Sequence, residues 1–279
     1  KTISGPWATP VPAVPAPRST TIASATVALA TALGLDFAGI DLRFAPTGEV
    51  YCFGNEMDTS TLDPEGVALI REGKYEEAVR LILERLPFPG TLGRVCPAPC
   101  EDHCRRDEVE EAIAIRDSHR YAGDQVLKAQ AEGVAPPVPF DQQPSTGKRV
   151  AVVGSGPSGM SAAYYLALNG HEVTVMERDP DPGGMLRYGI PEYRLPKERV
   201  LAAEYEAVWD LGVKLIAGVE LGTDFTIDDL QNEGYDAVLV AIGCYDTNKL
   251  GIPGEDADGV IDGLEYLRIA TLGLPYPDH

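Results

Sequence analysis

The fold is decided by one short stretch of the sequence, Arg149-Val150-Ala151-Val152-Val153-Gly154-Ser155-Gly156-Pro157-Ser158-Gly159. Its apolar first half is typical of a buried strand, and the glycine-rich second half follows without a break. A helix of small residues, 160–168, and a second strand, 172–176, are expected next, and the acidic residue Glu177 comes at the end of that strand. Strand, glycine turn, helix, strand and acid in this order are typical of a Rossmann-like dinucleotide-binding unit.

The residues of this unit have separate physical roles. Gly154 allows the tight turn, Gly156 lets a pyrophosphate approach the backbone, and Gly159 lets the helix pack on the strand. The first turn of the helix supplies free N–H groups and a partial positive charge for the phosphates. Glu177 is placed to accept hydrogen bonds from the adenosine ribose. The pattern predicts nucleotide binding, but it does not separate FAD from NAD(P), because both carry an ADP moiety.

The composition excludes several classes of function. The chain has 279 residues, enough for two domains with cores of their own, and 44% of them are hydrophobic. Its 43 acidic residues outnumber its 23 basic residues and give a net charge of -20, so the chain repels nucleic acid and anionic membrane surfaces. The longest weakly polar stretch, 21–35, is shorter than the roughly 20 apolar residues of a membrane-spanning helix. We expect a globular protein that binds neither nucleic acid nor membranes.

The pattern of prolines and apolar residues divides the chain. We expect five segments: a Pro-rich arm (1–20), a segment of unclear structure (21–61), a helical domain (62–132), a Pro-rich linker (133–147) and an α/β domain with the dinucleotide unit (148–279). In the helical domain, apolar residues at helical spacing predict one helix over 74–86, and a second is expected over about 109–129. The expected fold class is therefore α/β, with a helical domain ahead of the nucleotide-binding domain.

Three of the five cysteines, Cys96, Cys100 and Cys104, are clustered in the sequence. The cluster fits metal binding in a reducing compartment better than disulfides, so a cytoplasmic location is expected. An iron–sulfur cluster and a structural zinc site both remain open. A complete iron–sulfur cluster needs four ligands, and Cys52 is the cysteine upstream. Cys244 has no CxxC partner and is expected to be a small packing residue.

Further motifs lie on both sides of the dinucleotide unit. They are Gly93-Arg94-Val95-Cys96-Pro97-x-x-Cys100-Glu101-x-x-Cys104, Gly183-Gly184-Met185, Tyr188-Gly189-Ile190-Pro191, Arg194-Leu195-Pro196-Lys197 and Leu250-Gly251-Ile252-Pro253-Gly254-Glu255. On these motifs, residues 62–270 resemble the glutamate synthase small-subunit family, whose FAD domain is shared with the N-terminal half of dihydropyrimidine dehydrogenase. The resemblance implies a helical iron–sulfur-type N-terminal domain followed by a Rossmann-like FAD-binding domain.

The same resemblance implies a set of cofactor-binding residues. FAD would be held by Gly154, Ser155, Gly156, Pro157, Ser158, Gly159, Glu177, Gly184, Met185, Arg194, Glu220 and Gly243. Among them Gly184, Met185 and Arg194 would face the flavin, while Glu220 and Gly243 would contribute mainly backbone. A guanidinium can stabilise a reduced, anionic flavin, but Arg194 also fits a surface ion pair in such an acidic chain. Both interpretations of Arg194 stay open.

For the metal, the resemblance implies one [4Fe-4S] cluster held by Cys52, Cys96, Cys100 and Cys104. Two complete clusters are not expected, because the chain lacks the other cysteines that the family places upstream of its helical domain. His119 falls near the position where dihydropyrimidine dehydrogenase completes one cluster with a glutamine. His119 or a residue of a partner is therefore a further candidate ligand.

Two parts of the chain depart from the family. Residues from about 25 to 53 resemble the closing strands of an ATP-grasp ligase, with a hairpin-like turn at 46–49. No second glycine turn follows the first, so the nicotinamide site for NAD(P)H is expected in parts outside this chain. The FAD domain is expected to be incomplete at His279, either as part of a longer polypeptide or completed by another subunit.

The expected function follows from the resemblance. The chain would be a flavin and iron–sulfur electron-transfer module of an NAD(P)H-dependent oxidoreductase, passing electrons between a nicotinamide cofactor, FAD and a larger redox partner subunit. No side chain is an obvious acid or base catalyst, which suits chemistry that a cofactor performs. Two other functions remain open: a non-catalytic FAD-binding assembly subunit, and an ATP-grasp ligase fragment fused to a flavoprotein. An assembly subunit would hold flavin without iron.

Overall fold

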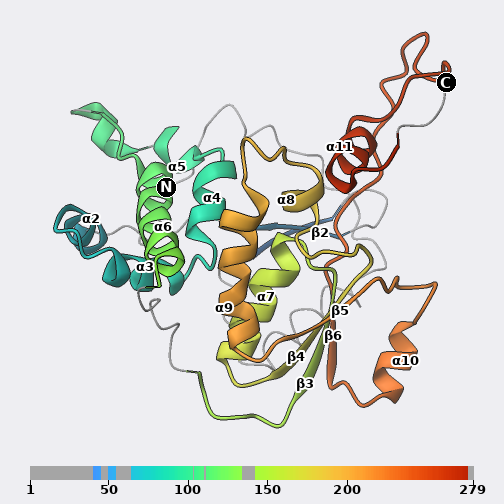
Figure 1. The fold of residues 1–279 in the computed structure, drawn as a ribbon, viewed down its shortest axis with the longest axis horizontal. Helices are drawn as coiled ribbons and strands as arrows, with labels where there is room; N and C mark the ends of the chain where they lie inside the picture. The colour runs from blue at the N-terminus through green and yellow to red at the C-terminus, as the bar shows by residue number, and fades with distance from the viewer. Residues whose placement is uncertain are drawn as a thin grey trace. The chain divides into compact units, whose positions relative to one another are not determined.

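The computed structural model describes residues 40–44, 50–54, 64–102, 104–109, 111–133 and 142–275 (Figure 1). The chain divides into two compact units, 1–56 and 57–279. In the first unit, strands β1 (Ile40–Phe44) and β2 (Val50–Gly54) pair antiparallel, with Ile40 opposite Gly54. This pairing agrees with the hairpin expected around 46–49. The predicted arm over 1–20 and the linker residues 134–141 lie outside the described residues.

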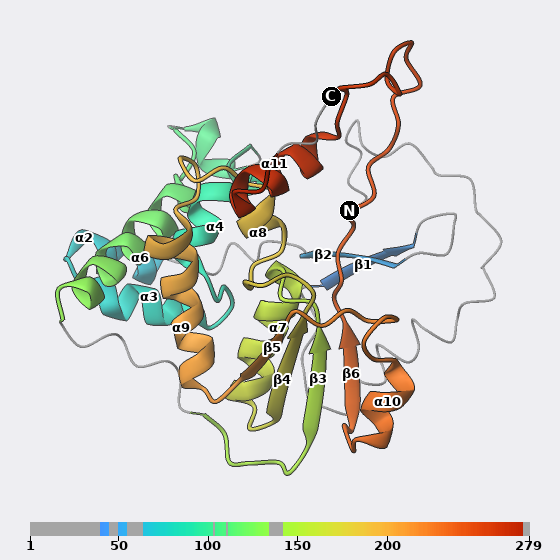
Figure 2. The same ribbon diagram turned by 45° about the vertical axis from the view of Figure 1, so that its right-hand side comes forward.

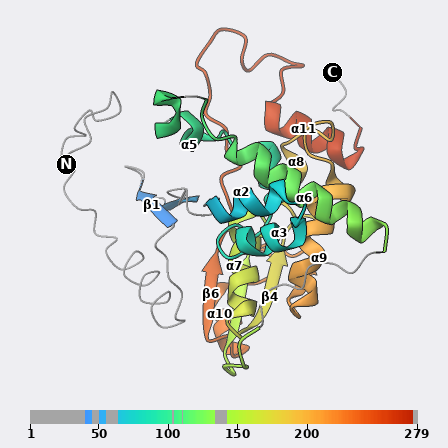
Figure 3. The same cartoon turned by 90° about the vertical axis from the view of Figure 1, so that its left-hand side faces the viewer.

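The second unit begins with a helical part. Its elements are α2 (Pro64–Arg71), α3 (Tyr75–Leu83), α4 (Pro89–Val95), α5 (Pro99–Asp102), the short helix η2 (Arg105–Glu108) and α6 (Ile115–Ala131). Figure 3 shows α2 and α3 lying against the long helix α6. Their shared core joins Ala78, Val79 and Ile82 of α3 to Ala122 and Val126 of α6. The apolar face predicted for the helix over 74–86 is therefore the face that it buries.

The start of α6 differs from the prediction of a helix over about 109–129. The helix begins at Ile115, and residues 111–114 before it have no regular secondary structure. A carboxylate from another element satisfies the helix end, because Glu101 Oε1 accepts a hydrogen bond from the backbone N–H of Arg116 at 2.8 Å. Because this cap comes from a distant part of the chain, the local pattern does not reveal it, and the prediction starts the helix at about Val109, six residues too early.

The rest of the second unit is an α/β part built on a parallel sheet. Its elements are β3 (Arg149–Val153), α7 (Pro157–Leu168), β4 (Glu172–Glu177), α8 (Met185–Tyr188), η3 (Lys197–Ala202), α9 (Ala203–Asp210), β5 (Lys214–Ala217), α10 (Ile227–Asn232), β6 (Ala237–Val240) and α11 (Gly263–Leu272). The strand order is β5-β4-β3-β6, and all neighbours are parallel (Figure 2). This is the strand–turn–helix–strand unit that the sequence predicts.

The central strand β3 is buried on both faces. A Cβ on Gly159 of α7 would lie 3.3 Å from Val152, so α7 covers the Val152 face. Leu230 of α10 packs in one cluster with Ala151 and Val153, which point to the opposite face. A strand covered on both sides reads as a continuous apolar run, which explains the composition of 149–153.

Parallel pairing brings the functional residues to one edge of the sheet. The carboxyl ends of β3 and β4 lie side by side, with Val153 paired to Met176. The glycine turn after β3 and Glu177 at the end of β4 therefore meet at this edge, where open α/β sheets bind ligands. No helix in the described part of the chain is long and apolar enough to cross a membrane.

Candidate functional site

Two glycines of the turn after β3 are required by close packing of the protein itself. Gly154 has φ +105°, and a Cβ there would lie 2.3 Å from the carbonyl oxygen of Ala241. A Cβ on Gly159 would lie 1.9 Å from the carbonyl oxygen of Gly154. Any side chain at either position would push the turn off the sheet, so both glycines shape the site without needing a ligand.

Gly156 is different, because the space beside it is open. A Cβ built on Gly156 would meet no atom within 4 Å. Gly156 is also the residue before α7, and no side chain caps that helix end. Pro157 occupies the first helical position, where its missing N–H costs nothing. The turn from Gly154 to Gly159, which we call the cradle, therefore has open space beside an uncapped helix N-terminus. This is the geometry that binds phosphate groups.

The Glu177 carboxylate joins the cradle to the residues that follow β4 through hydrogen bonds. It is buried, and its Oε2 accepts hydrogen bonds from the backbone N–H of Ser155 at 2.9 Å and from the Ser155 hydroxyl. Its Oε1 accepts one from the backbone N–H of Asp179 at 2.8 Å. The Ser155 hydroxyl oxygen in turn accepts one from the N–H of Gly183 at 3.2 Å. The expected ribose acceptor thus also holds the turn in shape.

The Gly183–Gly184 turn packs directly on the glycine turn. Gly184 has φ +50°, and a Cβ there would lie 2.8 Å from the Cα of Gly156. Helix α8 starts at the next residue, Met185, which is half-buried. The structure therefore brings Gly184 and Met185, which the sequence assigned to the flavin side, to the rim of the cradle.

Three other predicted residues lie on exposed segments. The side chain of Arg194 is exposed, in the turn before η3. The carboxylate of Glu220 is exposed and pairs with Arg178 at 3.7 Å, while its backbone N–H donates to Asp224. Gly243 is exposed, with φ +72°. Within the described ranges, the side chains of Arg194 and Glu220 make no hydrogen bond to the glycine turn, whereas Gly243 directly follows Ala241 and Ile242, whose backbone packs against Gly154.

Sequence reasoning missed several residues around Glu177. The guanidinium of Arg178 lies over the ring of Tyr245, 4.8 Å from its centroid. Asp179 is 1% exposed and accepts a hydrogen bond from Arg268 of α11, while its Oδ2 has no partner among the described residues. Only adjacency to Glu177 could have pointed to Arg178 and Asp179. Nothing in the sequence links either of them to residues so far along the chain.

The cysteine segment follows α4. Cys96 ends that helix, and its sulfur accepts a hydrogen bond from the N–H of Ala98 at 3.3 Å. Ala98 is buried in a left-handed turn with φ +55°. Burial, followed by the nearby charge of Glu101, raises the pKa of the Cys100 thiol. Hydrogen bonds from the backbone, first that of Ile113, lower the pKa of the Cys104 thiol. Such N–H donors stabilise thiolate sulfur and tune iron–sulfur centres.

The cysteines are not gathered into a finished metal site. Within the described ranges, no three His, Cys, Asp or Glu side chains are placed to hold one metal ion, and Cys96, Cys100 and Cys104 form no disulfide. His119 is buried, its Nε2 lacks a partner among the described residues, and burial lowers its pKa to about 4. The side chain of Cys52 lies outside the described residues. Among the described members of the predicted ligand set, Cys96, Cys100, Cys104 and His119 are therefore not assembled into one metal group.

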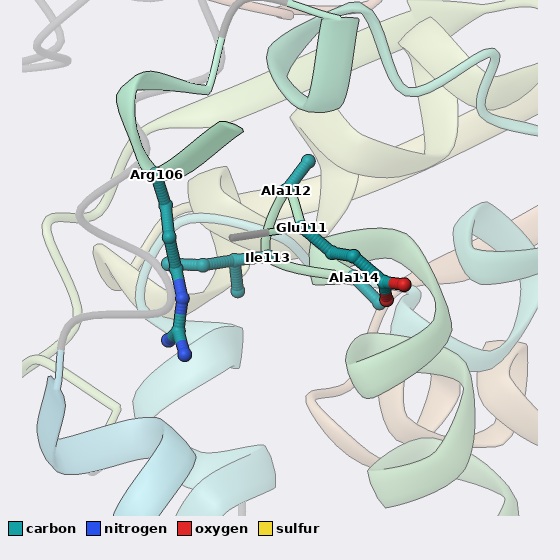
Figure 4. A pocket seen from close by; sticks show the side chains of 5 residues that line it. All are labelled: Arg106, Glu111, Ala112, Ile113 and Ala114. Carbon is teal, nitrogen blue, oxygen red and sulfur yellow. The ribbon is translucent and has the colours of Figure 1, made fainter. Parts of the chain in front are cut away.

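A cavity of about 540 Å³ lies between η2 and the residues just before α6. Figure 4 shows the side chains that line it: Arg106 from η2, and Glu111, Ala112, Ile113 and Ala114, which have no regular secondary structure. The backbone of Arg106 and Ile113 also supplies the hydrogen bonds to Cys104. The chain thus leaves open volume beside two residues whose backbone hydrogen bonds lower the pKa of Cys104.

Both parts of the second unit match known families. Residues 58–131 match dihydropyrimidine dehydrogenase domain II, 4Fe-4S cluster, and residues 152–211 match the NAD(P)-binding Rossmann-like domain. Over 211 residues the chain is 37% identical to the glutamate synthase [NADPH] small chain of Bacillus subtilis, covering 75% of this chain and 41% of that one. The predicted resemblance to the glutamate synthase small-subunit family is confirmed. The fold class, an iron–sulfur-type helical domain before a Rossmann-like domain, is confirmed with it.

Two other relatives show how widely this family region occurs. The chain is 41% identical to the NADP(+)-dependent formate dehydrogenase subunit beta of Moorella thermoacetica, covering 75% of this chain and 32% of the relative. It is 36% identical to the NADPH-Fe(3+) oxidoreductase subunit beta of Geobacter sulfurreducens, covering 76% of this chain and 31% of the relative. The chain spans about a third of the length of these two relatives. The ATP-grasp-like stretch gains no support from these matches.

Proposed function

We propose that this chain is the FAD and iron–sulfur module of an NAD(P)H-dependent oxidoreductase, which passes electrons to a partner subunit. The observation that carries the proposal is the open cradle at Gly156, in one compact unit with the cysteine segment. Residues 62–132 form the cluster domain, 133–147 the linker and 148–279 the first part of the FAD domain. Relatives named as NADPH-dependent oxidoreductase subunits support this function.

The residues of the cradle fit the ADP part of FAD. Ser155 to Gly159 line the side where a pyrophosphate lies against backbone N–H groups, and only a glycine at 156 leaves that space open. Glu177 Oε1 accepts one protein hydrogen bond, so it keeps capacity for a ribose hydroxyl. Gly184 and Met185 hold the rim toward the flavin. When bound, FAD supplies the hydride-accepting and electron-releasing chemistry.

The cysteine segment fits an iron–sulfur cluster in its donors. Cys96, Cys100 and Cys104 would be three ligands, and Cys52 is the fourth that we propose. The N–H of Ala98 donates a hydrogen bond to the Cys96 sulfur, and the backbone of Ile113 donates one to the Cys104 sulfur. Such donors favour thiolate over thiol, which is the form that binds a metal.

The proposal extends to partners and location. The relatives are named as a beta subunit or a small chain, which supports a larger redox partner subunit or the remainder of a longer chain. The net charge of -20 argues against nucleic acid and membrane partners. Thiols that bind a metal need a reducing compartment, so we place the protein in the cytoplasm.

A second candidate function is a non-catalytic FAD-binding assembly subunit. The observation in its favour is that the described cysteines and His119 form no assembled metal group. Such a subunit would keep the cradle and lose electron transfer to a cluster.

The cofactor content of the purified chain tests both functions. We expect FAD, iron and acid-labile sulfide together in anaerobically purified protein, with FAD identified by chromatography after release. FAD without iron would favour the assembly subunit. NAD(P) released in place of FAD would overturn the flavin assignment, and zinc in place of iron would overturn the cluster.

A further inference from the structure

One continuous helical segment runs between the cysteine-bearing part and the dinucleotide-binding part. It begins as the π-helix η3 at Lys197 and continues without a break into α9, which ends at Asp210. Figure 1 shows it between α4 and α7, and η3 contacts α4, α6 and α8 while α9 contacts α7. A π-helical turn is rare, and such turns occur frequently at functional sites. This segment touches both proposed cofactor domains.

The Glu204 side chain of this segment holds the cysteine-bearing part. Glu204 is 8% exposed, and its two carboxylate oxygens accept hydrogen bonds from the backbone N–H groups of Gly90 at 2.6 Å and Thr91 at 2.7 Å. Gly90 and Thr91 form the first turn of α4, and Cys96 directly follows that helix. A carboxylate from the flavin-side domain therefore caps the helix that leads into the cysteines.

The packing around this cap leaves no room for α4 to shift. A Cβ on Gly90 would lie 3.0 Å from Glu204 Oε1, and a Cβ on Gly123 of α6 would lie 2.8 Å from the Gly90 nitrogen. Arg94 of α4 also pairs with both carboxylate oxygens of Asp124, at 2.7 and 2.9 Å. Helix α4 is thus fixed between α6 and Glu204.

The first residue of the same segment holds the flavin side. The buried ammonium group of Lys197 donates hydrogen bonds to the carbonyl oxygens of Leu186 at 2.8 Å and Ile190 at 2.5 Å. Its backbone N–H donates to Glu192 Oε2 at 2.9 Å. These acceptors lie in the loop 184–196, which begins with the residues that we assign to the flavin side. Lys197 therefore fixes this loop as Glu204 fixes α4.

We propose that the Lys197–Asp210 helix is a strut that sets the separation between the flavin-side loop and the cysteine segment, with Lys197 and Glu204 as its two positioning residues. The proposal rests on the proposed function for the identity of the two cofactors that it separates. Electron transfer falls steeply with distance, so a redox module needs a rigid spacer between its centres. Both contacts are buried. The Lys197 ammonium group donates to carbonyl oxygens, whereas the Glu204 carboxylate accepts from N–H groups.

Amide hydrogen exchange of the full chain tests the strut without needing any cofactor. Glu204→Gln is compared with Glu206→Gln, because Glu206 lies on the same helix with an exposed side chain. Lys197→Met is compared with Arg199→Met for the same reason. Exchange is followed separately in peptides that cover α4 and peptides that cover the loop 184–196.

We expect Glu204→Gln to speed exchange in α4 roughly tenfold or more while leaving the loop unchanged, because the amide keeps one accepting oxygen and turns an NH2 group, which cannot accept, toward the other N–H. Lys197→Met should instead speed exchange in the loop 184–196 and leave α4 unchanged. Both exposed controls should exchange like the parent chain. No change in either target, or a uniform change across the chain, would overturn the proposal. If Glu204→Gln does not fold, Glu204→Asp, which keeps the charge and shortens its reach, is judged by the same criteria.

A second measurement separates positioning from stability in the loaded protein. The visible circular dichroism of bound flavin reports how the ring is held, so Lys197→Met should change it while FAD content stays constant. Glu204→Gln should slow cluster reduction after flavin photoreduction by roughly tenfold, with FAD and iron content unchanged. Unaltered dichroism and rates would refute positioning. A parent chain without FAD or iron would instead refute the proposed function, and the exchange data would still judge the strut.

Discussion

Glu177 and Ser155 are joined by two hydrogen bonds, one from the Ser155 backbone N–H at 2.9 Å and one from its hydroxyl, both accepted by Glu177 Oε2. The acid at the end of β4 is therefore part of the turn after β3 before any nucleotide is present. A buried carboxylate that accepts several N–H and O–H groups is a preorganised anchor, since each donor would otherwise lie buried without a partner. The cradle is shaped by this pair together with the glycines.

The first prediction concerns Glu177→Gln. The carboxylate accepts three donors from Ser155 and Asp179, whereas an amide presents two N–H groups of its own toward some of them. We expect the free energy of unfolding to fall by about 1–3 kcal/mol and FAD content to fall with it. Urea unfolding and released flavin measure both. Glu233→Gln, at an exposed carboxylate, is the control, and a Glu177→Gln chain with parental stability would contradict the anchor.

The second prediction separates ligand binding from folding at the glycine turn. Gly156→Val places its side chain in open space, so the apo chain should fold with nearly unchanged stability but should lose FAD. Gly263→Val is the matched control, because Gly263 is exposed and a Cβ there also meets nothing within 4 Å. Thermal unfolding and flavin occupancy give the two readouts. Full flavin occupancy in Gly156→Val would refute the assignment of the pyrophosphate to this turn.

The dinucleotide unit could be predicted from sequence because its determinants are local. The apolar run of β3, the glycines and Glu177 lie within one strand–turn–helix–strand unit, and each has a conformational reason that a single segment reveals. The structure adds a distinction that the pattern does not carry. Gly154 and Gly159 are needed by the protein's own packing, whereas a side chain at Gly156 would meet open space, so packing does not require that glycine.

The long-range contacts could not be predicted. Glu204 caps a helix 114 residues away in sequence, and Arg268 reaches Asp179 across 89 residues. The residues around a charged side chain on a helix do not indicate a partner so distant in sequence. From the sequence alone, Glu204 and Arg268 are therefore expected to be ordinary surface residues. The same limit explains the misplaced start of α6, where Glu101 accepts the N–H of Arg116 from outside the helix.

The third prediction concerns the metal. Changing any one of Cys96, Cys100 or Cys104 to Ser should strongly reduce the iron and acid-labile sulfide of anaerobically prepared protein, because each replacement removes a thiolate ligand. Cys244→Ser should leave both unchanged, since Cys244 is exposed and lies outside the cysteine segment. Elemental analysis with a sulfide assay decides the matter. Zinc without iron in the parent chain would contradict the cluster.

The fourth prediction concerns pH and Glu204. Burial raises the pKa of Glu204 from 4.5 to about 7, although hydrogen bonds from Thr91 and Gly90 partly oppose the rise. A carboxyl whose pKa is higher in the folded state contributes most below pH 4.5, and this contribution is lost as the pH rises through 7. The loss amounts to about 3 kcal/mol for a shift of this size. Glu204→Gln should therefore be less pH-sensitive than the parent chain between pH 4.5 and 7.

The comparison must be made between variants, because another group titrates in the opposite sense. Burial lowers the pKa of His119 to about 4, so its contribution to stability grows as the pH rises from 4 to 6.5. In the parent chain, Glu204 makes the free energy of unfolding fall with rising pH and His119 makes it rise. Glu204→Gln removes the Glu204 contribution alone. Urea unfolding at several pH values measures the difference, with Glu206→Gln as the exposed control. Identical slopes for Glu204→Gln and the parent chain would contradict the raised pKa.

The last prediction concerns the ion pair between Asp179 and Arg268, which holds α11 beside the cradle. Asp179 is 1% exposed, so Arg268→Met leaves a buried carboxylate without its cation, whereas Arg268 itself keeps 37% of its side chain exposed. Breaking a fully buried pair costs about 3–5 kcal/mol, and we expect about 1–3 kcal/mol here because solvent screens the arginine. Asp179→Asn should cost less, since it removes the buried charge as well.

A double-mutant cycle in urea should therefore show Asp179→Asn and Arg268→Met together costing less than the sum of the two changes. The exposed pair Lys214 and Glu172, at 2.7 Å, should give almost no coupling in the same assay. Additive costs for Asp179 and Arg268 would show that α11 is held at the cradle by packing alone.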